Sequence, residues 1–352
     1  MNRVVPVSTP HDPGVFFGIA DEEYHSAFAL SASGIKHIRA STLDFWVRSP
    51  LNPDQADVDT DEDTDAKMIG RAYHKRIVEG KEAFGKLYAP TLQREDYPYA
   101  LETMGDLRAH LKLLSLKVGG NKDELIARVR EGDPNIAVWD VLQENYIALA
   151  GGRTLLTPAL IKKIEIAAAM IEKHPQLGKA FTGGYPEVAI FWTDPEFGVP
   201  MKAKLDYLKR AAIIDLKTFT NVLGMPVDKA IAREIANRKY HIQARLYLDA
   251  VRQARAFIRD GRVFGDVEKE FLKSVAANTE HTFMFVFQQK GIAPLARGKI
   301  LPALTLDVGL VEINDAKWRF AEAWKKFGSD PWIDESEIAT FDPTEFPAYI
   351  AD

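Results

Sequence analysis

Two aspartates and a lysine lie close together in apolar surroundings. Asp206 precedes Asp215 by nine positions, and Lys217 follows Asp215 by two. Asp215 comes directly after the apolar run 211–214, where an unpaired carboxylate would be costly. A bound cation offsets that cost, and hard cations such as Mg²⁺ take carboxylate oxygens as ligands. The spacing therefore fits a metal site in which Lys217 orients or deprotonates a bound water, and it equally fits a solvated ion pair at the rim of a sheet.

Three strand-like runs position these side chains. Residues 188–192 form the first run, with Glu187 just before it. Residues 201–208 alternate apolar and polar side chains, which is typical of a half-buried strand, and 211–216 is almost purely apolar, which is typical of a central strand. A tight turn between the last two runs brings Asp206 next to Asp215. The spacing of two places Asp215 and Lys217 on one face of their strand.

Further motifs lie on both sides of the carboxylates in a fixed order. The order is a G-x-x-x-H element, an acidic residue, a second acidic residue, D-x-K and Q-x-x-x-Y. The elements are Gly70–His74, Glu187, Asp206, Asp215–Lys217 and Gln243–Tyr247. This set resembles the core of the PD-(D/E)xK nucleases, in the RecB-type branch that includes the RecE-type phage exonucleases (exonuclease VIII-like). The segment LSASGIKHIRAS, at 30–41, fits the RecE-like group too.

The resemblance implies an α/β, restriction-endonuclease-like fold, with a mixed sheet flanked by helices. It also implies a site that holds Mg²⁺ or Mn²⁺, with Lys217 as a catalytic residue. Glu187 would bind metal through water or position Lys217, while Gln243 and Tyr247 would align the substrate. The implied metal ligands are His74, Asp206, Asp215 and the carbonyl of Leu216. Nothing in the sequence predicts another cofactor.

The activity that the resemblance implies is 5′→3′ digestion of linear double-stranded DNA by an exodeoxyribonuclease, which leaves 3′ single strands for recombination. It implies DNA ends as the substrate, a single-strand annealing protein as a partner, a homo-oligomer, and a phage or prophage origin in a bacterial host. One alternative is a RecB-type nuclease acting on single strands or ends. Another is a catalytically inactive DNA-binding or assembly protein, against which the intact D…D-x-K set counts.

Composition restricts the class of protein. The chain has 352 residues, of which 46% are hydrophobic and 27% charged, as in a soluble globular protein. It has no cysteine, which excludes disulfides, thiol nucleophiles and the iron–sulfur cluster of some RecB-type nucleases. The net charge of −5 argues against coating nucleic acid through global charge, but it permits a local basic channel. No apolar run predicts a membrane span or a signal peptide, so we expect a cytoplasmic protein.

Residues 101–132 form a predicted insertion, a small helical hairpin with helices at about 104–114 and 121–130. Asn121 is a candidate N-cap with Glu124 three residues later, as in a capping box. The L-x-x-x-L helix, the loop glycines and the K-x-E-L-I-x-R run resemble the SAP motif, a DNA-binding helical module. The alternative is a hairpin that only packs on the nuclease core. Candidate phosphate contacts are Arg108, Lys112, Lys117, Lys122, Arg128 and Arg130.

The remaining sequence predicts the frame around these features. We expect an N-terminal part of the nuclease domain at 1–100, the nuclease core at 133–330 and an acidic irregular tail at 331–352. Predicted helices cover 31–47, 67–79, 157–174, 226–258 with a break near Asn237, and 313–327; further strands cover 282–288 and 299–307. Basic residues crowd the helix around Gln243, and the candidates for DNA contact there are Arg238, Lys239 and Arg245.

Overall fold

The computed structural model describes residues 12–55, 65–291 and 293–333, together with 338, 340 and 342–345. The chain divides into two compact units. Unit 1 comprises Met1–Thr64, Pro175–Lys290 and Ala296–Asp352, and unit 2 comprises Asp65–His174 and Gly291–Leu295. Most of the predicted tail, 331–352, lies outside the described residues.

Unit 1 is built on a seven-stranded mixed sheet with the order β7-β1-β4-β5-β6-β8-β9. β4, β5 and β6 form an antiparallel meander, and β8 joins β6 in parallel after a long helical crossover. This arrangement confirms the predicted α/β restriction-endonuclease-like fold class. The strands are β1 (Gly14–Phe16), β4 (Tyr185–Thr193), β5 (Pro200–Leu208), β6 (Ala212–Phe219), β7 (Val263–Phe264), β8 (Thr282–Gln289) and β9 (Ala296–Lys299).

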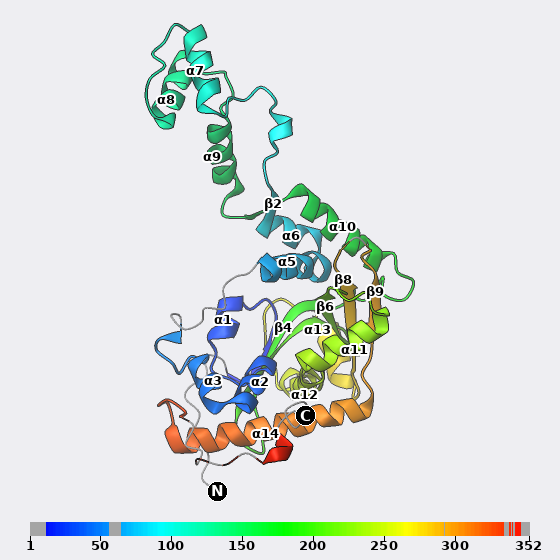
Figure 1. The fold of residues 1–352 in the computed structure, drawn as a ribbon. Coiled ribbons are helices and arrows are strands. Elements are labelled where there is room, and N and C mark those ends of the chain that lie inside the picture. The colour runs from blue at the N-terminus through cyan, green and yellow to red at the C-terminus, as the bar shows by residue number, and fades with distance from the viewer. Residues whose placement is uncertain are drawn as a thin grey trace. The chain divides into compact units, whose positions relative to one another are not determined.

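Helices cover the sheet and close the core of unit 1 (Figure 1). The apolar face of α12 (Tyr240–Arg259) packs on β4, β5 and β8, and α14 (Ala303–Phe327) packs on α12. The two helices approach closely because Gly309 has no side chain: a Cβ there would lie 2.8 Å from the carbonyl oxygen of His241. The other helices are α1 (Asp21–Ser26), α2 (Ala32–Ala40), α3 (Thr42–Val47), α11 (Val227–Arg238), α13 (Lys269–Ala277) and the turn η3 (Pro343–Glu345).

Two of the predicted elements are divided. The predicted helix 31–47 is α2 followed by α3, because the Ser41 side chain accepts a hydrogen bond from the Asp44 backbone and starts a second helix. Ser31 caps α2, whereas Ser33 lies within its first turn. The predicted break near Asn237 is confirmed at Lys239, which adopts a left-handed conformation between α11 and α12.

The predicted strand at 299–307 is wrong. β9 ends at Lys299, and α14 begins at Ala303, ten residues earlier than the predicted helix at 313–327. Alternating apolar residues in 301–306 suggest a strand, but Pro302 occupies the N-cap position. From there Leu306, Leu310 and Ile313 recur at helical spacing, which decides the local structure.

Unit 2 is mostly helical. The helices that we predicted in the insertion are present, and each begins with a capping box, Thr103 with Asp106 and Asn121 with Glu124. Together with Val138 they bury a small apolar cluster of their own. The elements are α5 (Asp65–His74), the π-helix η1 (Lys75–Glu79), α6 (Gly80–Leu87), β2 (Tyr88–Pro90), η2 (Arg94–Asp96), α7 (Met104–Leu113), α8 (Lys122–Gly132), α9 (Trp139–Ala150), β3 (Thr154–Leu156) and α10 (Pro158–Glu172), with β2 and β3 paired in parallel.

Across the described ranges, no helix is both long enough and apolar enough to span a membrane.

Candidate active site

Asp206 lies where the ladder between β5 and β6 ends. The two strands pair through Tyr207 with Ile214 and Leu208 with Ile213. Beyond these pairs, Oδ2 of Asp206 accepts a hydrogen bond from the backbone nitrogen of Leu216 at 2.8 Å. The carboxylate thus takes the place that a β5 carbonyl would have in a continued ladder. In an antiparallel ladder the N–H and the C=O of a hydrogen-bonded residue point toward the same partner strand. The carbonyl of Leu216 therefore points toward β5, as its N–H does.

Asp215 is the fully buried centre of the site, with an exposed fraction of 0%. Its Oδ1 lies 2.6 Å from Nζ of Lys217, and its Oδ2 accepts a hydrogen bond from Nε2 of Gln243 at 2.7 Å. Burial alone would lower the pKa of Lys217, but the carboxylates of Asp215 and Asp206 raise it above its ordinary value. The structure therefore brings Asp206, Asp215, Lys217 and Gln243 together.

Tyr247 supports this arrangement from α12. Gln243 and Tyr247 are one helical turn apart and share a hydrogen bond. Burial raises the pKa of Tyr247 well above its ordinary value, so its hydroxyl stays protonated. Gln243 consequently links a buried, neutral tyrosine to the carboxylate of Asp215, and this link fixes the orientation of the amide.

Glu187 lies beside Asp206 but is held differently. Its neighbours Pro186 and Val188 pair with Tyr207 and Leu205, which places Glu187 level with Asp206 on β5. Its φ of 53° is in the left-handed region, which is strained for a non-glycine residue. Oε2 of Glu187 lies 2.7 Å from Nζ of Lys204, which also binds Asp21.

Lys204 is a charged partner that the sequence reasoning missed. It lies two residues before Asp206 on β5, and the alternation of 201–208 is the signal that could have placed both on one face.

The donor set in unit 1 fits a divalent cation. Asp206 and Asp215 supply carboxylate oxygens, and the carbonyl of Leu216 faces them; oxygen donors of this kind suit Mg²⁺ and Mn²⁺. Nζ of Lys217 pairs with Asp215, and Nζ of Lys204 is shared by Glu187 and Asp21.

His74 belongs to unit 2, whereas the other predicted ligands belong to unit 1. It ends α5 and is followed directly by the π-helical turn Lys75–Glu79. Such turns within helices are frequent at functional sites. Its membership of one metal site with Asp206 and Asp215 stays a prediction.

The basic residues predicted to contact DNA differ in how they are bound within the protein. In unit 2, Nη1 of Arg128 donates hydrogen bonds to the carbonyls of Lys117 and Gly119, and Lys122 pairs with Asp140 at 2.6 Å. These two side chains hold the hairpin together. The side chains of the remaining candidates point into solvent; they are Arg108, Lys112, Lys117 and Arg130.

In unit 1, Arg245 is bonded within the protein, whereas the other two candidates are exposed. Arg238 and Lys239 are exposed at the junction of α11 and α12, although Nε of Arg238 also lies 3.3 Å from the carboxylate of Glu234 one helical turn earlier. Nε of Arg245 donates to Asp249 at 3.1 Å, and only 16% of the side chain is exposed. The structure thus leaves Arg238 and Lys239 accessible and engages Arg245 internally.

Lys36 and Tyr240 are further residues at this site that the sequence reasoning did not single out. Nζ of Lys217 lies 5.0 Å from the centre of the Tyr240 ring, and Nζ of Lys36 lies 5.7 Å from the same centre. Lys36 is part of the segment 30–41, which the sequence reasoning used only as a whole, for its resemblance to the RecE-like group.

Comparison with known proteins identifies a family and similar solved structures. No curated protein matches the chain significantly. A crystal structure from Eubacterium rectale, described as a "Putative exonuclease", aligns with 16% identity over 87% of this chain and 87% of that chain, with a TM-score of 0.38. A family model described as a PDDEXK-like domain of unknown function (DUF3799) matches residues 31–286, the range that holds every predicted catalytic and metal-binding residue. This match supports the prediction of a nuclease that uses divalent metal ions. The chain belongs to this family of PDDEXK-like domains.

Proposed function

We propose that this protein is a metal-dependent exodeoxyribonuclease that digests linear double-stranded DNA in the 5′→3′ direction and leaves 3′ single strands for recombination. The observation that carries the proposal is the buried carboxylate of Asp215, held between Lys217 and Gln243 and next to the carboxylate of Asp206. Nucleases with PDDEXK-like domains generally use divalent metals, and Mg²⁺ or Mn²⁺ suits these oxygen donors. The direction of digestion rests on the resemblance to RecE-type exonucleases.

Each residue of the site has a role in this reaction. A divalent cation held by Asp206, Asp215 and the Leu216 carbonyl, with His74 as a proposed fourth ligand, would supply an activated water and neutralise phosphate charge. The Leu216 amide fixes the carboxylate of Asp206, and Gln243, itself held by Tyr247, fixes that of Asp215.

Lys217 and Glu187 complete the proposed chemistry. As an ammonium group, Lys217 donates hydrogen bonds and stabilises negative charge that develops on the phosphate. Glu187, in its strained conformation beside Lys204, would bind the cation through water or position Lys217.

The proposal extends to partners. We expect ends of linear duplex DNA as the substrate, a homo-oligomer as the active form, and an annealing protein that receives the 3′ strand. Exposed Arg238 and Lys239, with the exposed basic residues of the SAP-like insertion, are the proposed contacts to the DNA backbone. A cytoplasmic location in a bacterial host, with a phage or prophage origin, goes with this function.

Digestion of end-labelled DNA tests the proposal. A linear duplex labelled separately at its 5′ and 3′ ends is incubated with Mg²⁺ and wild-type protein, next to a closed circle. Early release of 5′-terminal nucleotides and an intact circle are expected, and chelation of the metal should stop the reaction. Lys217→Ala should be inactive, whereas Lys325→Ala, an exposed lysine near the end of α14, should behave as wild type. Cutting of the circle would indicate an endonuclease, and no metal-dependent cleavage of any DNA would refute the proposal.

A further inference from the structure

Two lysine ammonium groups lie near one aromatic ring at the candidate active site. Lys217 on β6 and Lys36 on α2 both point to the ring of Tyr240, with Nζ atoms 5.0 Å and 5.7 Å from its centre. Lys217 has a clear partner in Asp215. Within the described part of the chain, no carboxylate lies within ion-pair distance of Lys36.

The surroundings of Lys36 are unfavourable for a cation. It is half-buried, and the charged groups that act on it include Lys217, Arg238 and Lys239. Burial and then these cations lower the pKa of Lys36 to about 8, and only the carboxylate of Asp215 opposes them. Holding an ammonium group in such a place reduces stability. An anion bound among these groups would compensate for that loss.

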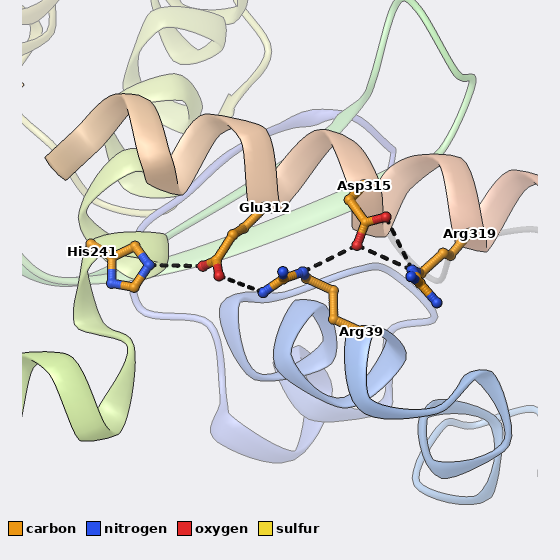
Figure 2. Close-up of polar contacts among 5 residues, drawn as sticks. All are labelled: Arg39, His241, Glu312, Asp315 and Arg319. Carbon is orange, nitrogen blue, oxygen red and sulfur yellow. Dashed lines mark hydrogen bonds and ion pairs between the residues drawn. The ribbon is translucent and has the colours of Figure 1, made fainter. Parts of the chain in front are cut away.

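Glu312 joins the helices that carry Lys36 and Tyr240, and Figure 2 shows its contacts with Arg39 and His241. Oε1 of Glu312 lies 2.6 Å from Nη1 of Arg39, three residues after Lys36 on α2. Oε2 of the same carboxylate lies 2.7 Å from Nε2 of His241, the residue after Tyr240. One carboxylate on α14 thus ties together the two helices that carry Lys36 and Tyr240.

Asp315 and Arg319 extend this tie along α14. Nε of Arg39 donates to Asp315 at 3.1 Å, and Asp315 also accepts from Arg319 at 3.1 Å (Figure 2). A network of charged side chains thus holds α2, which carries Lys36, to α12 and α14.

We infer that Lys36 binds a phosphate oxygen of the DNA strand beside the metal site, next to the Tyr240 ring that Lys217 also approaches. This inference rests on the proposed function and names a specific contact within it. A phosphate is the anion that the nuclease reaction must bring to Lys217. An ammonium group near 6 Å from the same ring centre is placed to bind that phosphate or the next one along the strand. Lys36 is a substrate-positioning residue in this assignment, separate from the metal ligands.

The salt dependence of DNA binding tests the contact without any cleavage. The full chain is titrated against a fluorescent linear duplex in EDTA at several salt concentrations. Loss of one phosphate contact in Lys36→Met should reduce the slope of log K against log salt by about 0.9. Lys36→Arg, which keeps the charge, should retain most of the slope. Lys325→Met, which removes an exposed lysine about 20 Å along α14 from Glu312, should match wild type.

The outcomes distinguish an internal phosphate from the 5′-terminal phosphate. They also test the Lys36 contact separately from the proposed nuclease activity. A reduced slope on duplexes with both 5′-phosphate and 5′-hydroxyl ends supports an internal phosphate, and a reduction only with 5′-phosphate supports the terminal one. An unchanged slope in Lys36→Met, with an unfolding midpoint equal to that of wild type, would overturn the inference. If Lys36→Met does not fold, Lys36→Gln is measured in the same way. Because binding is read without metal, failure of the nuclease proposal would appear separately, as an absence of Mg²⁺-dependent cleavage.

Discussion

Removal of Lys217 should destabilise unit 1 strongly in the absence of metal. Asp215 has an exposed fraction of 0%, and only 16% of the Lys217 side chain is exposed. Lys217→Met keeps the length of the side chain and removes its charge, so the buried carboxylate of Asp215 keeps the hydrogen bond from Gln243 but loses its ion-pair partner. Removing one partner of a buried ion pair costs about 3–5 kcal/mol. That is a large part of the roughly 5–15 kcal/mol by which a domain is stable.

The paired variant Asp215→Asn with Lys217→Met separates burial of a charge from loss of packing. Asn has the shape of Asp and no charge, so the double variant has no uncompensated charge in the core. Replacing both members of a buried pair is often close to neutral. We therefore expect the double variant to recover most of the stability that Lys217→Met loses, and the thermodynamic cycle to give a coupling of at least about 2 kcal/mol.

Urea unfolding in EDTA, followed by tryptophan fluorescence, measures these differences. Of the 6 tryptophans only Trp139 belongs to unit 2, so the signal reports mainly on unit 1. Two results would refute the reasoning. One is a Lys217→Met midpoint equal to that of wild type, and the other is a double variant as unstable as the single one.

Three further predictions concern the metal site, the network on α14 and the hairpin of unit 2. Calorimetry should show Mn²⁺ binding to wild type and none to Asp206→Ala; equal binding to both would remove Asp206 from the ligand set. Burial would raise the pKa of Glu312, but His241 and Arg39 lower it overall. The ionised Glu312 carboxylate therefore stabilises the folded protein above the unfolded pKa of about 4.3, and this stabilisation is lost as the pH falls through the lower pKa of the folded state. Glu312→Gln should therefore be less stable than wild type at neutral pH, with urea midpoints that converge in acid; a difference independent of pH would contradict this. Arg128→Ala should speed amide exchange around Lys117 and Gly119, since charged hydrogen bonds of about 1.5–3 kcal/mol each are lost there, and unchanged exchange would refute the role of Arg128 in closing the loop.

The central strands could be predicted from the sequence because burial repeats there at the period of a strand. The alternation of 201–208 and the apolar run before Asp215 correspond to β5 and β6, and the turn between them brings Asp206 to the backbone beside Asp215. The spacing of two also sufficed to pair Lys217 with Asp215. These features depend on local geometry, which a sequence records directly.

Contacts between distant segments could not be predicted in the same way. Lys204 binds Asp21 and Glu187, and Lys36 meets Tyr240, over separations that no periodicity encodes. The error at 299–307 has a different origin: a short apolar run fits both a strand and a helix, and Pro302 settles the local structure as a helix start. A proline just before a helical apolar pattern was the signal available for correcting it.

The features of unit 1 that are hardest to explain by stability gather around one part of the sheet. Asp215 is a fully buried charge, Glu187 has a strained backbone, and Lys36 is a half-buried cation among other cations. Buried ion pairs add little net stability, and strained residues persist only where their surroundings hold them in place. In this protein the surroundings are specific: Gln243 and Lys217 hold Asp215, Lys204 holds Glu187, and Glu312 fixes the helices that carry Lys36 and Tyr240. Local violations of folding preferences are expected at functional sites, where binding of charged ligands compensates for them. A divalent cation beside the aspartates and a phosphate beside the lysines would neutralise both sets of charges at once, which is why we assign the two ligands to one site.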